Sequence, residues 1–79
     1  MSAPPTNAAP DVPLSLTVNG EPRELPAGLT VAGLLEELGV PARGSAVERN
    51  RELVPRRQHA DTPLCSGDRI EIVTLVGGG

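Results

Sequence analysis

The sequence contains no phenylalanine, tyrosine or tryptophan, so any core must be built from aliphatic side chains. It has one cysteine, Cys65, which excludes an internal disulfide. With His59 as the single histidine, it also does not offer the ligands of a usual Cys/His zinc site. Lysine is absent, and no apolar run approaches the roughly 20 residues of a membrane helix. We therefore expect neither a metal centre nor a membrane span.

Charge and length narrow the function classes further. The net charge is −3, and neither a basic stripe nor an aromatic platform is present, which disfavours nucleic-acid binding. A chain of 79 residues supports one domain with a thin core, so a binding or carrier module is favoured over a self-contained enzyme. The N-terminus has no basic region followed by an apolar stretch, so we expect a cytoplasmic protein without a signal peptide.

The chain divides into three parts. Residues 1–13 hold four prolines and little to bury, so we expect a disordered lead. Residues 14–76 carry the folded pattern, and residues 77–79 form a flexible glycine tail.

The first half of the domain predicts a hairpin and a helix. Residues 14–18 alternate apolar and polar side chains, Asn19-Gly20 is typical of a type I′ turn, and residues 21–25 pair back. Because Pro22 lacks an N–H group, this second strand should lie at a sheet edge. Thr30 is placed to cap a helix that ends at Gly39, with the exposed Glu36 and Glu37 opposite an apolar face formed by Val31, Leu34, Leu35 and Leu38.

The second half predicts further strands at residues 45–49 and 52–54, with Val47 facing inward. Residues 55–64 read as polar and irregular, and a turn at 66–68 leads into a strong last strand that runs from about Ile70 to Val76. The expected fold class is α+β, a mixed sheet of four to five strands with one main helix packed on one face.

The C-terminal glycines are the most informative candidate site. The α-carboxylate of Gly79 has no side chain beside it, and three extended residues reach roughly 10 Å beyond the fold. We expect His59 to lie in a surface loop, Cys65 to be a small buried residue, and Arg56-Arg57 to be solvated. No side chain is assigned as catalytic.

Several segments resemble the ThiS family of sulfur carriers in that family's order and spacing. They cover residues 14–79 and include LTVAGLLEEL (29–38), AVERN (46–50), VPR (54–56), SGDRIEIV (66–73) and LVGGG (75–79). The resemblance implies a ubiquitin-like β-grasp fold. It also implies that a ThiF-like enzyme uses ATP to adenylate Gly79, that a cysteine desulfurase or a rhodanese-like protein supplies sulfur, and that the resulting thiocarboxylate donates it to a ThiG-like thiazole synthase. In this view Gly77 and Gly78 belong to the tail, and Gly78 and Gly79 fit the enzyme's channel. Leu75 and Val76 help to dock the tail, near an apolar patch on the sheet.

Other functions remain open at this stage. A related carrier for molybdopterin or another metabolite would share the tail chemistry. A protein modifier conjugated to other proteins is also compatible, although without lysine the chain cannot form polymers on itself. A plain interaction module with an idle tail is a further alternative. A self-sufficient enzyme is the least favoured.

Overall fold

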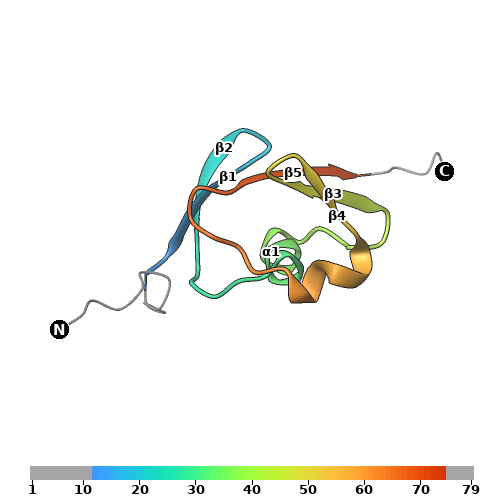
Figure 1. Ribbon diagram of the computed structural model, residues 1–79, viewed down its shortest axis with the longest axis horizontal. Coiled ribbons are helices and arrows are strands. Elements are labelled where there is room, and N and C mark those ends of the chain that lie inside the picture. The colour runs from blue at the N-terminus through green and yellow to red at the C-terminus, as the bar shows by residue number, and fades with distance from the viewer. Residues whose placement is uncertain (1–11, 75–79) are drawn as a thin grey trace.

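Residues 12–74 form a five-stranded mixed sheet with one α-helix and one 3₁₀ helix on one side of it (Figure 1). The computed structural model describes residues 12–74. The elements are β1 (Leu14–Val18), β2 (Glu21–Leu25), α1 (Val31–Leu38), β3 (Ser45–Arg49), β4 (Glu52–Val54), η2 (Arg56–Asp61) and β5 (Arg69–Thr74). The strand order is β2-β1-β5-β3-β4, in which β1 and β5 are parallel and all other neighbours are antiparallel.

The first hairpin forms as the sequence predicts. Leu16 and Val18 of β1 are buried, and the turn has positive φ at Asn19 (52°) and Gly20 (84°). Asparagine and glycine tolerate this conformation better than other residues, which explains the position of the turn. β2 is an edge strand, so the missing N–H group of Pro22 leaves no gap inside the sheet, and the expectation for that strand is confirmed.

Helix α1 also has the predicted bounds. The Oγ1 atom of Thr30 accepts a hydrogen bond from the backbone N–H of Gly33 at 3.2 Å. Gly39 ends the helix in the left-handed conformation, with φ of 70°. Val31, Leu34 and Leu35 are buried, whereas Glu36 and Glu37 are exposed, as the periodicity indicates.

The segment after β4 differs from the prediction. It was expected to be irregular, but residues 56–61 form the 3₁₀ helix η2, which lies beside α1. The chain beyond η2 is joined to the start of α1, because the Val31 N–H donates to the carbonyl of Thr62 at 2.9 Å and the Leu64 N–H donates to that of Leu29 at 3.0 Å. These bonds satisfy backbone groups that an irregular buried segment would leave unpaired.

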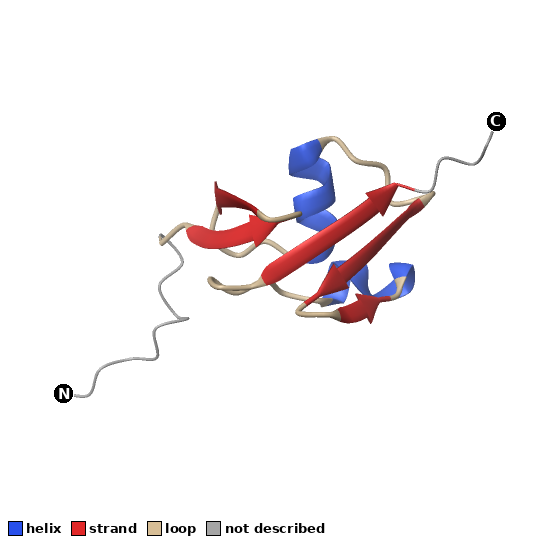
Figure 2. Ribbon diagram, turned by 90° about the horizontal axis from the view of Figure 1, so that it is seen from above, coloured by secondary structure: helices blue, strands red, loops and turns tan. Residues whose placement is uncertain are grey.

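The core lies between the sheet and the two helices. Its largest fully buried side chains are Leu34, Ile70, Val31 and Val47. Figure 2 looks down onto the sheet, with the helices behind it. This arrangement is the ubiquitin-like α+β fold. Within residues 12–74 no helix is long and apolar enough to cross a membrane.

Candidate functional site

β5, the strand that leads toward the C-terminal residues, is the central strand of the sheet. It pairs with β3 over five residues, ending at Ser45–Thr74, and with β1 on its other side. The chain is thus held by hydrogen bonds up to the point where its description ends. The predicted tail and docking positions Leu75, Val76, Gly77, Gly78 and Gly79 lie outside the described residues.

A buried carboxylate anchors the start of β5. The Oδ2 atom of Asp68 accepts hydrogen bonds from Arg49 Nε and from the backbone N–H of Cys65, both at 2.8 Å. Its Oδ1 atom accepts one from Asn50 Nδ2 at 3.1 Å. Asn50 in turn accepts the N–H of Arg69 on its side-chain oxygen at 2.9 Å. The turn before β5 and the β3–β4 turn are therefore joined by one polar network.

The network also sets the charge state of Asp68. Burial raises the pKa of this carboxyl, but hydrogen bonds from Arg49, Cys65 and Asn50, together with the Arg49 charge, outweigh burial and hold the pKa below its ordinary value. The hydrogen bond to Asp68 likewise raises the pKa of Arg49. Asp68 is therefore an ionised structural anchor at neutral pH.

Asn19 holds the middle of β5. The Ile72 N–H donates to Asn19 Oδ1 at 2.8 Å, and Asn19 Nδ2 donates to the Ile72 carbonyl at 3.3 Å. The side chain replaces the next residue of β1 and extends the parallel ladder. In the sequence Asn19 was read as a turn signal and Asp68 as part of a turn. The bonds of Asn19 to Ile72 and of Asp68 to Arg49 and Asn50 were missed, because no local sequence pattern indicates contacts with residues so distant in the chain.

The sheet face opposite the helices carries exposed apolar side chains near the end of β5. Val73 is 57% exposed and Leu53 is 64% exposed. Val73 is in register with Ala46, and Leu53 with Glu48, which places all of them on one face. We call Ala46, Leu53 and Val73 the outer-face patch. The sequence analysis expected such a patch near the tail.

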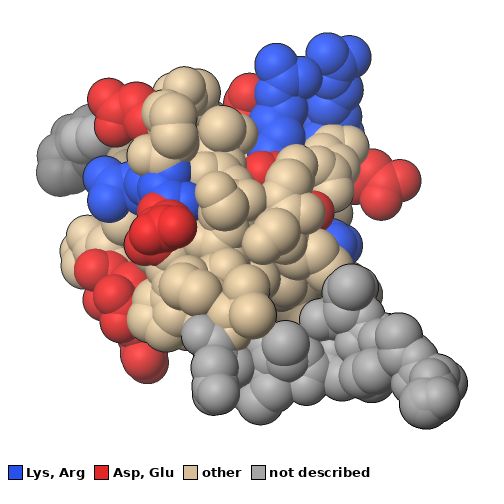
Figure 3. Space-filling view, turned by 90° about the vertical axis from the view of Figure 1, so that its left-hand side faces the viewer, with Lys and Arg blue, Asp and Glu red and all other residues tan. Residues whose placement is uncertain are grey.

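Charged side chains of both signs lie on the surface of the described residues. Figure 3 shows one end of the molecule, where acidic and basic side chains are interspersed over an uncharged surface. Glu48 and Glu71 are in register on neighbouring strands, on the same face of the sheet as the outer-face patch. Arg56 and Arg57 are exposed, as expected.

Two residue predictions are wrong. His59 was expected in a surface loop, but it is only 4% exposed, because η2 turns its ring inward against α1. Cys65 was expected to be buried, but it is exposed. Its neighbour Leu64 fills the core position instead. The Cys65 sulfur lies 3.9 Å from Arg49 Nη2.

Metal-binding side chains do not cluster in the described part of the chain. No group of three or more His, Cys, Asp or Glu residues there is placed to hold an ion. The features that the fold brings together are instead a central strand paired on both sides, its two anchors and an apolar patch beside it.

Known proteins are similar to this chain both in sequence and in fold. The ThiS family matches residues 16–79. The sulfur carrier protein ThiS of Thermus thermophilus is 45% identical over 62 residues, covering 78% of this chain and 95% of that protein. Its Escherichia coli counterpart is 33% identical over 66 residues, covering 84% of this chain and all of that protein.

The fold comparison agrees with the sequence comparison. The crystal structure of the thiamine biosynthesis protein ThiS from Geobacter metallireducens matches with a TM-score of 0.72 and 36% identity, over 84% of this chain and all of that one.

A thiazole synthase from Paramagnetospirillum magneticum is 48% identical over 66 residues, and the chain spans about a fifth of the length of that relative. From the family match, the full-length relatives and the shared fold, the chain belongs to the ThiS family.

Proposed function

We propose that this sulfur carrier of the ThiS family holds sulfur as a thiocarboxylate on Gly79 and donates it for the thiazole of thiamine. The observation that carries the proposal is the position of β5. It is the central strand, is paired on both sides up to Thr74, and leads directly toward the C-terminal glycines. A partner that grips the domain thus receives the chain end from a fixed point.

The chemistry needs activation, because a carboxylate is a poor electrophile. A Gly79 carboxylate oxygen attacks the α-phosphorus of ATP in a ThiF-like enzyme, and pyrophosphate leaves. The terminal sulfur of a cysteine persulfide then attacks the acyl carbon, and AMP leaves. A second thiol cleaves the sulfur–sulfur bond, which releases the thiocarboxylate and forms a disulfide. The carrier supplies the reacting carboxylate and contributes no catalytic side chain, so we propose that it is not itself an enzyme.

The partners follow from the same scheme. The thiazole synthases that resemble this chain over about a fifth of their length support a synthase of that kind as the sulfur acceptor. The ATP-dependent ThiF-like enzyme and a cysteine desulfurase or rhodanese-like donor are proposed from the chemistry. The outer-face patch is the proposed docking surface, because exposed apolar side chains beside the reacting end commonly mark an interface. We propose that the chain acts in the cytoplasm, where these partners work.

Deleting Gly78 and Gly79 tests the proposal. In a bacterium that lacks its own ThiS and in which the full chain restores growth without thiamine, the shortened chain should fail to restore it. A variant changed at the exposed Arg57 to alanine, which keeps the tail, is the matched control and should support growth. Growth with the shortened chain would show that the tail carries no sulfur.

A further inference from the structure

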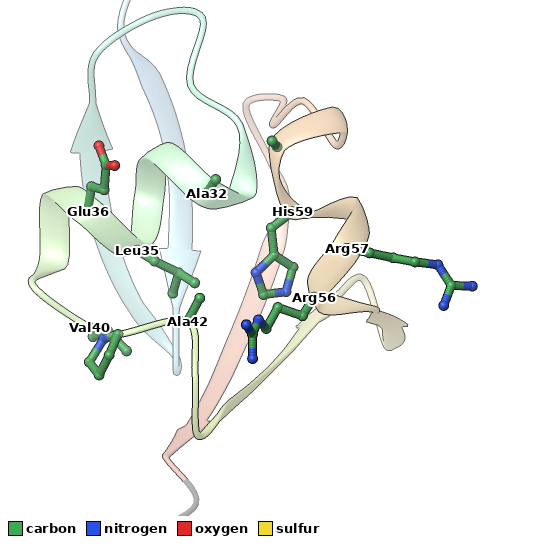
Figure 4. A pocket seen from close by; sticks show the side chains of 10 residues that line it. Ala32, Leu35, Glu36, Val40, Ala42, Arg56, Arg57 and His59 are labelled. Carbon is green, nitrogen blue, oxygen red and sulfur yellow. The ribbon is translucent and has the colours of Figure 1, made fainter.

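A pocket of about 430 Å³ lies on the helix side of the molecule, between α1, the loop that follows it, and η2. Figure 4 shows the His59 ring projecting into this space from η2, with Leu35 and Ala42 across from it. Arg56 extends on the same side as the ring, whereas Arg57 points away. The proposed tail chemistry uses none of these residues.

The hydrogen bond on one side of the ring fixes the chemistry of the other side. His59 Nε2 lies 3.1 Å from the backbone oxygen of Val54. A carbonyl oxygen can only accept, so Nε2 carries the proton. In the neutral ring Nδ1 is then an acceptor. The pocket therefore contains one defined hydrogen-bonding position.

This acceptor has no partner. Among buried side-chain atoms of residues 12–74, His59 Nδ1 is the one without a hydrogen bond, and it exposes less than 1 Å². Buried polar atoms are nearly always satisfied, so such an atom calls for an explanation. Apart from the exposed Glu36, Arg56 and Arg57, the other lining side chains are apolar. A buried water needs two to four polar partners, and this lining offers few.

We propose that the pocket receives a tryptophan or tyrosine side chain of a partner protein, whose indole N–H or phenol O–H donates to His59 Nδ1. The pocket is far larger than a water molecule or a single hydroxyl group would need. Its aliphatic lining fits the flat apolar ring of an aromatic side chain. Arg56 can lie against the face of such a ring. Nδ1 exposes less than 1 Å² in the free chain, so the side chains around it must move for the donor to reach it.

No tryptophan or tyrosine of this chain can occupy the pocket, because the sequence contains neither residue. It contains no aromatic side chain at all, so an aromatic donor must come from another molecule. The pocket is formed by the helix layer, whereas the outer-face patch lies on the opposite face of the sheet. A partner bound here therefore leaves that face free, and this inference stands or falls independently of the tail chemistry.

The test is a titration of the ¹⁵N-labelled full chain with N-acetyl-tryptophanamide, followed by NMR. The matched control ligand is its 1-methylindole analogue, which keeps the ring but lacks the donor. We expect the amide signals of Leu35, Ala42 and Ala60 to shift, together with the His59 Nδ1 signal. The donor ligand should bind about fivefold or more tightly than the methylated one, the usual penalty for leaving a buried acceptor unpaired.

Two variants separate binding from folding. His59→Leu should abolish the preference between the two ligands. Should that variant be unfolded, Arg56→Ala keeps the acceptor, changes an exposed residue, and should weaken both ligands by about two- to fivefold. Equal affinity of the two ligands, shifts located elsewhere, or binding of free indole without binding of N-acetyl-tryptophanamide would each overturn the proposal.

Discussion

Asn19 and Ile72, which are 53 residues apart in the sequence, are joined through both backbone groups of Ile72. The Ile72 N–H donates to the asparagine oxygen at 2.8 Å, and the asparagine amide donates to the Ile72 carbonyl at 3.3 Å. The side chain of a turn residue thereby makes the two hydrogen bonds that the backbone of a further β1 residue would make. These two bonds hold β5, the strand that leads toward the C-terminal glycines.

Replacing Asn19 with glycine should loosen β5. Glycine keeps the positive φ of the turn, so the change isolates the two side-chain hydrogen bonds. We expect a loss of about 1–3 kcal/mol in the free energy of unfolding, two bonds at 0.5–1.5 kcal/mol each. Urea denaturation measures the loss, and hydrogen exchange at the Ile72 amide should become faster. An unchanged urea midpoint with unchanged exchange would show that the two bonds do not hold the strand.

The Asp68 anchor should give the fold a dependence on acid. Because the folded pKa of Asp68 is lowered, its stabilisation is complete above the ordinary aspartate pKa of about 3.9 and is lost as the pH falls through the folded pKa. The difference in unfolding free energy between wild type and Asp68→Asn should thus be constant near neutral pH and shrink in acid. Urea titrations of both proteins, from neutral pH down to acid pH, measure this difference. A difference that grows in acid would mean that the carboxylate is not stabilised in the fold.

Leu35 and Leu53 allow the same substitution to be compared at a buried and at an exposed position. Leu35 is 2% exposed, and Leu35→Ala should cost about 2–5 kcal/mol of unfolding free energy because it opens a cavity. Leu53→Ala removes the same atoms from the outer-face patch and should change stability by no more than about 0.5 kcal/mol. Thermal unfolding followed by circular dichroism distinguishes the two. Similar losses for both variants would contradict the assignment of Leu35 to the core.

The outer-face patch makes a separate prediction about docking. Val73→Asp adds a charge to an exposed position beside Ala46, so the fold should persist. The affinity of the Val73→Asp variant for the proposed activating enzyme should fall about tenfold or more, as expected when a buried interface contact is lost. Isothermal titration calorimetry with the ThiF-like partner measures this. Wild-type affinity would place the docking surface elsewhere.

Much of this fold could be predicted from the sequence, because apolar residues recur at the spacing that places them on the buried face of a strand or a helix. Leu16 and Val18 alternate with polar neighbours, and Val31, Leu34 and Leu35 fall on one helix face, so strand and helix patterns are distinct. The caps at Thr30 and Gly39 are also local, since each acts within one turn of the helix.

The features that were missed depend on contacts between distant segments. Segment 55–64 has no apolar repeat, so η2 and the burial of His59 follow only from packing against α1. Asp68 is held in a buried position by Arg49, at the end of β3, and by Asn50 in the β3–β4 turn. Cys65 is exposed although cysteine is commonly buried, since Leu64 already occupies the core position. Residue type alone could not decide these cases.

The measurement that most directly tests the central claim is the intact mass of the chain after incubation with ATP, a ThiF-like enzyme and a sulfur donor. We predict a gain equal to the replacement of one oxygen by one sulfur, located in the C-terminal peptide. Cys65→Ser should show the same gain, and Gly79→Val should stay folded and show none. No gain with a demonstrably active enzyme, or a gain located on Cys65, would contradict a thiocarboxylate at Gly79.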